Sequence, residues 1–252
     1  RNLVPLGSAF PSPSLFPLPK LALALGRAAR NLDAWKTVEH LTPGSADLRR
    51  QIALRYLAMG CNVDVQELVI TNGAMEALNL CLETVTRPGD LVAVESPTFY
   101  AALQALERLN LRAVEVATHP RTGIDVQSLA AVLERHPVKA CWLMPNFQNP
   151  LGSLMPEPAK QALVALLAQH DVPLIEDDVY GELYFGPQKP RPAKAWDKKG
   201  LVMHCSSFSK SLAPGYRVGW AAAGRFAAAV GKRMLMSSLS ACVPAQEGLS
   251  YY

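Results

Sequence analysis

Residues 206–219 read SSFSKSLAPGYRVG and lie between two short apolar runs, at 201–206 and 218–222. Runs of this length and composition are typical of buried strands. A crossover between parallel strands takes a dozen or more residues and usually contains a helix. The connector is too short for a crossover helix and too rich in Ser, Pro and Gly. We therefore expect that these two strands are not parallel neighbours and that one of them runs antiparallel to the sheet.

On both sides of this stretch, short apolar runs alternate with longer segments of helical spacing. The runs predict strands at 68–71, 91–95, 112–116, 140–144, 174–176, 201–206 and 218–222. The longer segments predict helices at 47–58, 74–84, 100–108, 126–135, 156–170 and 225–238. Most of the strands are almost continuously apolar, which indicates a sheet covered on both faces. The predicted fold class is therefore α/β, with a mostly parallel seven-stranded sheet and helices on both faces.

Five prolines fall within the first 20 residues. Proline supplies no amide donor and disfavours helix in the residue before it. We therefore expect residues 1–30 to form an extended N-terminal arm. The remainder, 31–252, shows neither an internal repeat nor a low-complexity tract and is predicted to be one domain.

Composition excludes several classes of protein. With 50% hydrophobic and 18% charged residues, the chain has the profile of a globular protein with a large core. Five widely spaced cysteines without a C-x-x-C pair indicate no disulfide framework and no metal site, which favours a cytoplasmic location. No apolar run approaches the roughly 18 residues of a membrane span, so no membrane partner is expected. The net charge of +4 comes without a long basic block, so this segment is not predicted to bind nucleic acid.

Lys210, framed by hydroxyl side chains, suggests two chemistries. In one, Ser207-x-x-Lys210 is the nucleophile and base of a penicillin-binding fold, but the S-D-N and K-T-G elements that accompany it are absent from the sequence. In the other, Lys210 forms a Schiff base with an aldehyde cofactor. The neighbouring serines and Arg217 then bind the phosphate of that cofactor.

The second chemistry predicts further residues. Pyridoxal phosphate acts as an electron sink and needs a carboxylate at its ring nitrogen. Asp177 follows a buried strand, at the edge of an α/β sheet where ligands bind. Tyr180 lies three residues later and has a hydroxyl for the phenolate oxygen of the cofactor. Asn149 follows another strand and is a second donor to that oxygen.

Two more stretches suit this cofactor. Residues 71–76 read TNGAME and run from a strand through Gly73 into a helix, and the amides of a helix N-terminus bind phosphate. Ala74 and Met75 would supply such amides. Phe99 and Tyr100 follow another strand and are candidates to pack on the pyridine ring.

Each of these residues alone has an ordinary interpretation. A lysine among serines is most often a solvated loop residue, and an acid at a strand end is often a turn or cap residue. The combination favours the cofactor, because separate strand ends each carry the residue type that the cofactor needs.

From about residue 40 to 225 these residues, in this order, resemble the fold-type-I, class I and II aminotransferase family. The resemblance implies that Lys210 carries the Schiff base and that Asp177 pairs with the ring nitrogen. It implies that Tyr180 and Asn149 bind the phenolate oxygen and that Phe99 stacks on the ring. The catalytic residues that it implies are Lys210, Asp177 and Tyr180. The phosphate ligands that it implies are the backbone at Gly73, Ala74 and Met75 and the side chains of Ser207, Ser209 and Arg217.

Three shorter stretches resemble the aminotransferase-like domain of MocR-type regulators of the GntR family: LFP at 15–17, EHLTPG at 39–44 and NFQNPLG at 146–152. This resemblance implies a homodimer, and DNA binding only through a winged helix-turn-helix upstream of Arg1. It also implies that the C-terminal small domain, with its arginine for the substrate carboxylate, begins near or after Tyr252. One departure is His40, near which the family commonly places a Tyr that reaches the phosphate of the other subunit.

The residues leave two functions and one further alternative open. The chain is either the domain of a transcription regulator that senses an amino acid or amine through aldimine exchange, or a free-standing aminotransferase that transfers an amino group to a 2-oxo acid. The further alternative is a structural remnant that holds no cofactor. For aminotransferase chemistry Lys210 must act as a general base and needs a lowered pKa, which we expect burial and the nearby Arg217 to provide.

Overall fold

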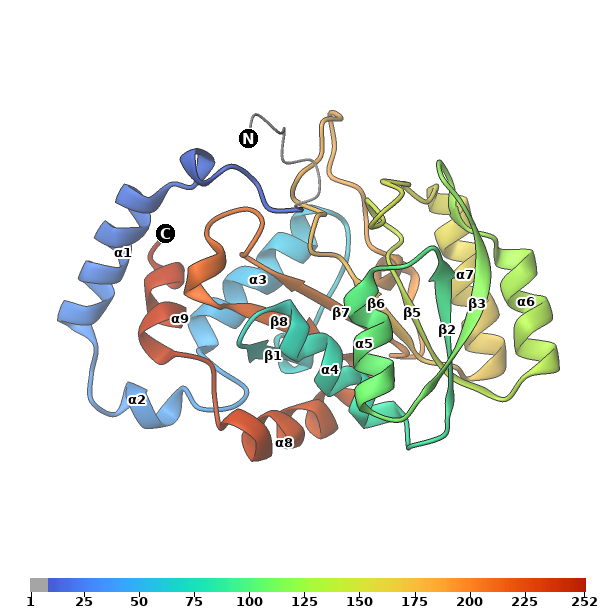
Figure 1. The fold of residues 1–252 in the computed structure, drawn as a ribbon. Helices are drawn as coiled ribbons and strands as arrows, with labels where there is room; N and C mark the ends of the chain where they lie inside the picture. The colour runs from blue at the N-terminus through green and yellow to red at the C-terminus, as the bar shows by residue number, and fades with distance from the viewer. Residues whose placement is uncertain (1–8) are drawn as a thin grey trace, which may run out of the picture.

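The computed structural model describes residues 9–252, so residues 1–8 of the predicted arm lie outside the described residues. Its centre is one eight-stranded sheet with the strand order β1-β8-β7-β6-β5-β2-β3-β4 (Figure 1). The strands are β1 (Leu68–Thr71), β2 (Leu91–Ser96), β3 (Arg112–His119), β4 (Gly123–Ile124), β5 (Val138–Leu143), β6 (Leu174–Asp177), β7 (Val202–Ser207) and β8 (Gly219–Ala222).

All seven predicted strands are present, and the predicted antiparallel strand is β8. It pairs antiparallel with both β7 and β1, whereas β7, β6, β5, β2 and β3 run parallel to one another. The predicted number of strands is wrong by one, because β4 adds an eighth strand antiparallel to β3. A strand of two residues is too short to form an apolar run. It arises where Gly123, at a φ of +79°, lies at the turn back along β3.

The helices are α1 (Leu18–Asn31), α2 (Lys36–Glu39), α3 (Ala46–Ala58), α4 (Ala74–Val85), α5 (Tyr100–Arg108), α6 (Val126–Arg135), α7 (Glu157–His170), α8 (Ala227–Ser238) and α9 (Val243–Ser250). Six of them match the predicted helices within two residues at each end. None of the helices within residues 9–252 is long and apolar enough to cross a membrane.

The contacts of β7 show which helix covers which face of the sheet. His204 contacts Tyr56 of α3, and the next residue, Cys205, contacts Cys81 of α4. Successive side chains of a strand point to opposite faces, so α3 and α4 lie on opposite faces. Buried residues of α5 join the apolar cluster of α4, and those of α6 and α7 join a second cluster behind the sheet (Figure 1).

The N-terminal segment departs from its prediction. Residues 18–31 form helix α1, so the extended conformation predicted for residues 1–30 is wrong in this part. Pro17 and Pro19 are compatible with the helix because they lie at its cap and first turn, where an amide donor has no partner within the helix to lose. One face of α1 packs beside α9, which was also not predicted, and buries Leu21, Ala24 and Ala28 (Figure 1).

Strand β8 meets the first turn of α4 at two glycines. The chain leaves β1 at Thr71 and enters α4 through Gly73, which has a φ of +90°. A Cβ atom on Gly219 would lie 2.5 Å from the carbonyl carbon of Gly73 and 2.7 Å from the amide nitrogen of Ala74. The lack of a side chain at Gly219 thus lets the loop that joins β7 to β8 lie against the N-terminus of α4.

We expect Gly219→Ala to destabilise the fold by roughly 1–3 kcal/mol, because a methyl group would be forced into backbone atoms that have no space to move. Urea unfolding monitored by circular dichroism measures the change. Gly215→Ala is the matched control in the same loop, since a Cβ atom there meets nothing within 4 Å. Equal stability of the two variants would contradict this account.

Candidate functional site

A cavity of about 570 Å³ opens at the carboxyl ends of the parallel strands. It brings together ten of the eleven predicted site residues, and the eleventh, Gly73, lies directly beside Arg217 at its rim. The predicted residues that line it are Ala74, Met75, Phe99, Asn149, Asp177, Tyr180, Ser207, Ser209, Lys210 and Arg217. Residues from five separate strand ends therefore meet in one place, although up to 143 positions separate them in the sequence.

Lys210 lies in the loop after β7 and points into the cavity. Its ammonium group donates a hydrogen bond of 2.9 Å to the carbonyl oxygen of Ala9 and lies 3.7 Å from the centroid of the Phe10 ring. Burial lowers the pKa of Lys210, and the nearby charge of Asp177 opposes the change. Burial, one of the two predicted causes, therefore lowers this pKa, whereas the other predicted cause, the charge of Arg217, does not contribute to the shift.

Asp177 ends β6 at the floor of the cavity and is 1% exposed. Its Oδ1 atom is buried and has no hydrogen-bond partner among the described residues. Burial, together with the charge of the neighbouring Asp178, raises the pKa of Asp177 to about 7. A buried carboxylate oxygen without a donor is costly, so this position favours a ligand that brings an N–H group or a positive charge.

Tyr180 and Asn149 lie together on the wall beside Asp177. The side-chain amide of Asn149 donates to the Tyr180 hydroxyl at 3.5 Å, a long contact that leaves both groups available to a shared acceptor. Burial raises the pKa of Tyr180, so its hydroxyl stays protonated at neutral pH and can donate a hydrogen bond.

The opposite end of the cavity has the character of an anion site. Gly73 caps α4 without a side-chain hydrogen bond, so the amides of the first turn point outward. The Arg217 guanidinium donates to the backbone oxygen of Asn72 at 2.9 Å and to the Ser209 hydroxyl at 3.3 Å. The Ser207 hydroxyl in turn accepts from the Ser209 amide at 3.3 Å. Arg217 is thus held across the helix N-terminus, where both would attract a phosphate.

Phe99 and Tyr100 form the aromatic part of the wall. Their rings meet edge to face, with centroids 5.0 Å apart, and both residues line the cavity. Tyr100 is 69% exposed and Phe99 is half-buried. The more enclosed position of Phe99 fits its predicted role as the ring that a flat ligand packs against.

Sequence reasoning missed two features, one that lines this cavity and one that is buried near Asp177. Ala9 and Phe10 line the cavity, and only the path of the N-terminal segment brings them there. Glu95 is 2% exposed at the end of β2 and accepts a hydrogen bond of 2.9 Å from the Met144 amide. The sequence signal that indicates Glu95 is an acid at the end of an apolar run.

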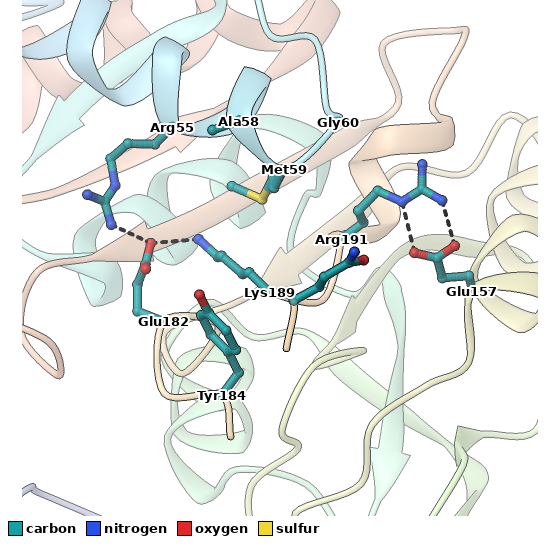
Figure 2. Close-up of a pocket in the computed structure, with 10 residues that line it drawn as sticks. Arg55, Ala58, Met59, Gly60, Glu157, Glu182, Tyr184, Lys189 and Arg191 are labelled. Atoms are coloured by element: carbon teal, nitrogen blue, oxygen red, sulfur yellow. Dashed lines mark hydrogen bonds and ion pairs between the residues drawn. The ribbon is translucent and has the colours of Figure 1, made fainter. Parts of the chain in front are cut away.

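A second cavity, of about 690 Å³, is lined by other residues, half of which are charged (Figure 2). Glu182 binds both Arg55 and Lys189, with N–O distances of 2.7 and 2.6 Å. Arg191 pairs with Glu157 through two nitrogens. The charges of this cavity are thus paired with one another, and none of the predicted site residues lines it.

Comparisons with known proteins agree on one family. The family model for aminotransferase class I and II matches residues 15–249. The chain is 55% identical to an uncharacterized HTH-type transcriptional regulator of Escherichia coli, YdcR, over 100% of this chain and 54% of that protein. It is 33% identical to aromatic-amino-acid aminotransferase 1 of Thermococcus litoralis, over 88% of this chain and 54% of that protein. The chain thus spans about half the length of these relatives.

A solved structure gives the same result. The α-aminoadipate aminotransferase LysN of Thermus thermophilus, crystallised with N-(5'-phosphopyridoxyl)-L-leucine, superposes with a TM-score of 0.87 at 30% identity. The match covers 96% of this chain and 62% of that one. The arrangement of strands and helices described above is therefore shared with an enzyme of known structure.

Glu95 yields a testable pH dependence. Burial raises its pKa to about 8 from an ordinary value of 4.5, so between these pH values the folded chain keeps a proton that the unfolded chain loses. The protonated Glu95 carboxyl group therefore makes its full contribution to the stability of the folded chain below pH 4.5, and this contribution is lost as the pH rises toward 8. We expect Glu95→Gln to reduce the loss of stability in this window by about 1.4 kcal/mol per pH unit.

Urea unfolding at pH 5 and pH 8 measures this effect. Glu107→Gln, at an exposed position of α5, is the control and should leave the pH dependence of wild type unchanged. If the Glu95 variant lost as much stability between the two pH values as wild type, the protonation assigned to Glu95 would be wrong.

Proposed function

Because the chain belongs to the class I and II aminotransferase family, we propose that the cavity around Lys210 binds pyridoxal 5'-phosphate and an amino acid or amine. One observation carries the proposal: a half-buried lysine, a buried acid with an unpartnered oxygen and an arginine at a helix N-terminus line a single cavity. These are the three groups that an aldehyde, a pyridine nitrogen and a phosphate require.

The residues present fit the cofactor. The unpartnered Oδ1 of Asp177 suits the protonated ring nitrogen, which would supply the missing donor and the positive charge. Arg217 and the serines at 207 and 209 suit the phosphate, together with the amides of Ala74 and Met75. Glycine suits position 73 because the φ there is +90° and because a Cβ atom would overlap the Arg217 guanidinium in its present position.

The remaining wall also fits. Tyr180 and Asn149 both bring donors to the same point, which suits the phenolate oxygen. Phe99 is the enclosed aromatic residue and suits the face of the ring. Ala9 and Phe10 lie over Lys210, so the N-terminal segment would help to keep water away from the lysine.

When bound, the cofactor supplies an aldehyde that condenses with amines and a ring that accepts electrons from a breaking bond. Lys210 provides the amine that attaches to the aldehyde, and when an amino acid replaces it the free Nζ moves a proton as general base. The pKa of Lys210, lowered by burial, suits this task because a neutral amine is required. Asp177 keeps the ring nitrogen protonated.

We propose that the chain is the effector-sensing domain of a MocR-type regulator of the GntR family. The support is its 55% identity over its full length to an HTH-type regulator, against 33% to the aromatic-amino-acid aminotransferase. DNA would then be bound by a different domain, and the site would belong to a homodimer. The alternative is a free-standing aminotransferase, which the close fold match to LysN supports.

Attachment of the cofactor is the first test. Wild-type chain mixed with pyridoxal phosphate should gain a visible absorption band, and borohydride reduction followed by peptide mapping should find the label on Lys210. Lys210→Ala should abolish both, whereas Lys139→Ala, at an exposed position of β5, should change neither. Absence of the band, or label spread over surface lysines, would favour a remnant without cofactor.

Release of product separates sensing from turnover. The full-length protein, loaded with cofactor, is given a panel of amino acids together with a 2-oxo acid acceptor. For a sensor we expect a change in absorption with at most one equivalent of 2-oxo acid formed per site. Repeated formation, well above one equivalent, would contradict the sensor and identify an aminotransferase. Lys210→Ala controls for uncatalysed transfer.

A further inference from the structure

The carboxylate of Glu76 joins three segments at the N-terminus of α4. Glu76 lies in the first turn of this helix and is half-buried. Its Oε2 atom accepts two hydrogen bonds from Asn72, one from the backbone amide at 2.6 Å and one from the side-chain amide at 3.0 Å. Its Oε1 atom accepts from the hydroxyl of Ser238, the last residue of α8, at 2.7 Å. The Ser238 contact keeps the carboxylate turned toward Asn72.

Asn72 lies between β1 and Gly73 and is hydrogen-bonded on both sides of its Cα atom. Its N–H group donates to Glu76, and its carbonyl oxygen accepts from Nη2 of Arg217 at 2.9 Å. Only the two dihedral angles φ and ψ separate the N–H and C=O groups of one residue. A contact that holds the N–H group of Asn72 therefore also restricts the direction in which its carbonyl oxygen points.

The hydrogen bonds of Arg217 differ in what they can position. Arg217 is exposed at the rim of the cavity, and its Nη1 atom donates to the Ser209 hydroxyl at 3.3 Å and to the carbonyl oxygen of Pro214 at 3.2 Å. Both of these partners belong to the loop that carries Arg217. Among residues 9–252, Asn72 is the hydrogen-bond partner of Arg217 outside this loop. The bond to Asn72 therefore determines where the guanidinium lies relative to the amides of α4.

The charge of Glu76 has an effect opposite to that of its hydrogen bonds. A negative charge in the first turn of a helix occupies the positive field that attracts an anion. Acting through its charge alone, Glu76 would weaken the binding of a phosphate at this helix N-terminus. Its hydrogen bonds to Asn72 strengthen such binding, because they keep Arg217 in place. The two effects differ in sign, so an experiment can separate them.

We propose that Glu76 is a positioning residue for the phosphate end of the cavity. It holds Asn72, and the carbonyl oxygen of Asn72 holds Arg217. The inference rests on the proposed function in taking the phosphate of the cofactor as the ligand of Arg217. Glu76 is not one of the residues that line the cavity, so its effect on the phosphate passes through Asn72 and Arg217.

Two variants separate position from charge. Glu76→Ala removes the acceptor of Asn72, and alanine is compatible with the helix. Glu76→Gln removes the charge but keeps an oxygen that accepts from Asn72, while its amide nitrogen donates to the Ser238 hydroxyl. The proton of Ser238 can then point to the sulfur of Met234, which lies 3.3 Å from the hydroxyl oxygen. Glu76→Gln is therefore the conservative rescue.

The first measurement compares pyridoxal phosphate with pyridoxal, which carries the same aldehyde without the phosphate. The dissociation constant of pyridoxal divided by that of pyridoxal phosphate, from absorption titrations of the full chain, gives the contribution of the phosphate. We expect Glu76→Ala to decrease this ratio roughly tenfold, the effect of one hydrogen bond to a charged group. Glu76→Gln should keep or increase the ratio of wild type. The control is Glu83→Ala in the same helix, where Glu83 pairs with Arg108, and it should leave the ratio unchanged.

The second measurement needs no cofactor. NMR relaxation of the arginine Nε–H groups, with the Arg217 signal assigned by means of Arg217→Lys, reports how firmly the guanidinium is held. We expect the order parameter of Arg217 to fall in Glu76→Ala and to match wild type in Glu76→Gln. Circular dichroism checks that each variant is folded. If Glu76→Ala does not fold, Glu76→Asp takes its place, because aspartate suits the first turn of a helix but is one methylene group shorter and withdraws the carboxylate from Asn72.

Three results would overturn the proposal. The first is a wild-type ratio, or an unchanged order parameter of Arg217, in the folded alanine or aspartate variant. The second is tighter binding of pyridoxal phosphate in both Glu76→Ala and Glu76→Gln, which is the effect of charge alone. The third is an equal loss of the ratio in these two variants. If the chain does not bind pyridoxal phosphate, the Lys210 labelling experiment shows it, and the order parameter of Arg217 still decides the role of Glu76.

Discussion

The close approach of β8 to the first turn of α4 is the constraint on which the rest of the site depends. At Gly219 and Gly73 two backbones meet with no space for a Cβ atom. This contact places the β7–β8 loop across the helix N-terminus, so that Arg217 reaches the backbone oxygen of Asn72. The helix amides and the guanidinium group that we propose as the phosphate site therefore come from segments 145 positions apart in the sequence.

The sheet also contains two buried carboxylic acids, Glu95 and Asp177, which have few hydrogen-bond partners. The pKa values of Glu95 and Asp177 are raised to about 8 and about 7, mainly by burial. Such groups lower the stability of the folded chain at neutral pH compared with well-paired carboxylates. A ligand that brings a protonated nitrogen to Asp177 would relieve part of this cost, so the site and the stability of the fold are coupled through the same carboxyl group.

The regulator and the enzyme alternatives share this site and differ in what surrounds it. Both need a lysine that attaches the cofactor and an acid that holds its ring nitrogen. Turnover additionally requires that the lysine transfer protons repeatedly and that the product leave the site. Opening and closure of the site for these steps can depend on segments of the relatives that this chain does not match, since it covers 54% of YdcR and 62% of LysN. Sensing requires only that binding of an amino acid change the conformation of the protein.

The sequence alone determined the seven main strands, six helices, an antiparallel strand on one side of Lys210 and the residues that meet at the cavity. These features follow from local patterns, namely apolar runs, turn residues and polar groups at strand ends. Each such pattern can be recognised within about ten consecutive residues. The tertiary structure alone decided that prolines 17 and 19 start helix α1, that Ala9 and Phe10 lie over Lys210, and that His204 links Tyr56 to Asp178. These contacts join residues up to 201 positions apart in the sequence. Such contacts depend on the path of the whole chain, which cannot be predicted from a local sequence pattern.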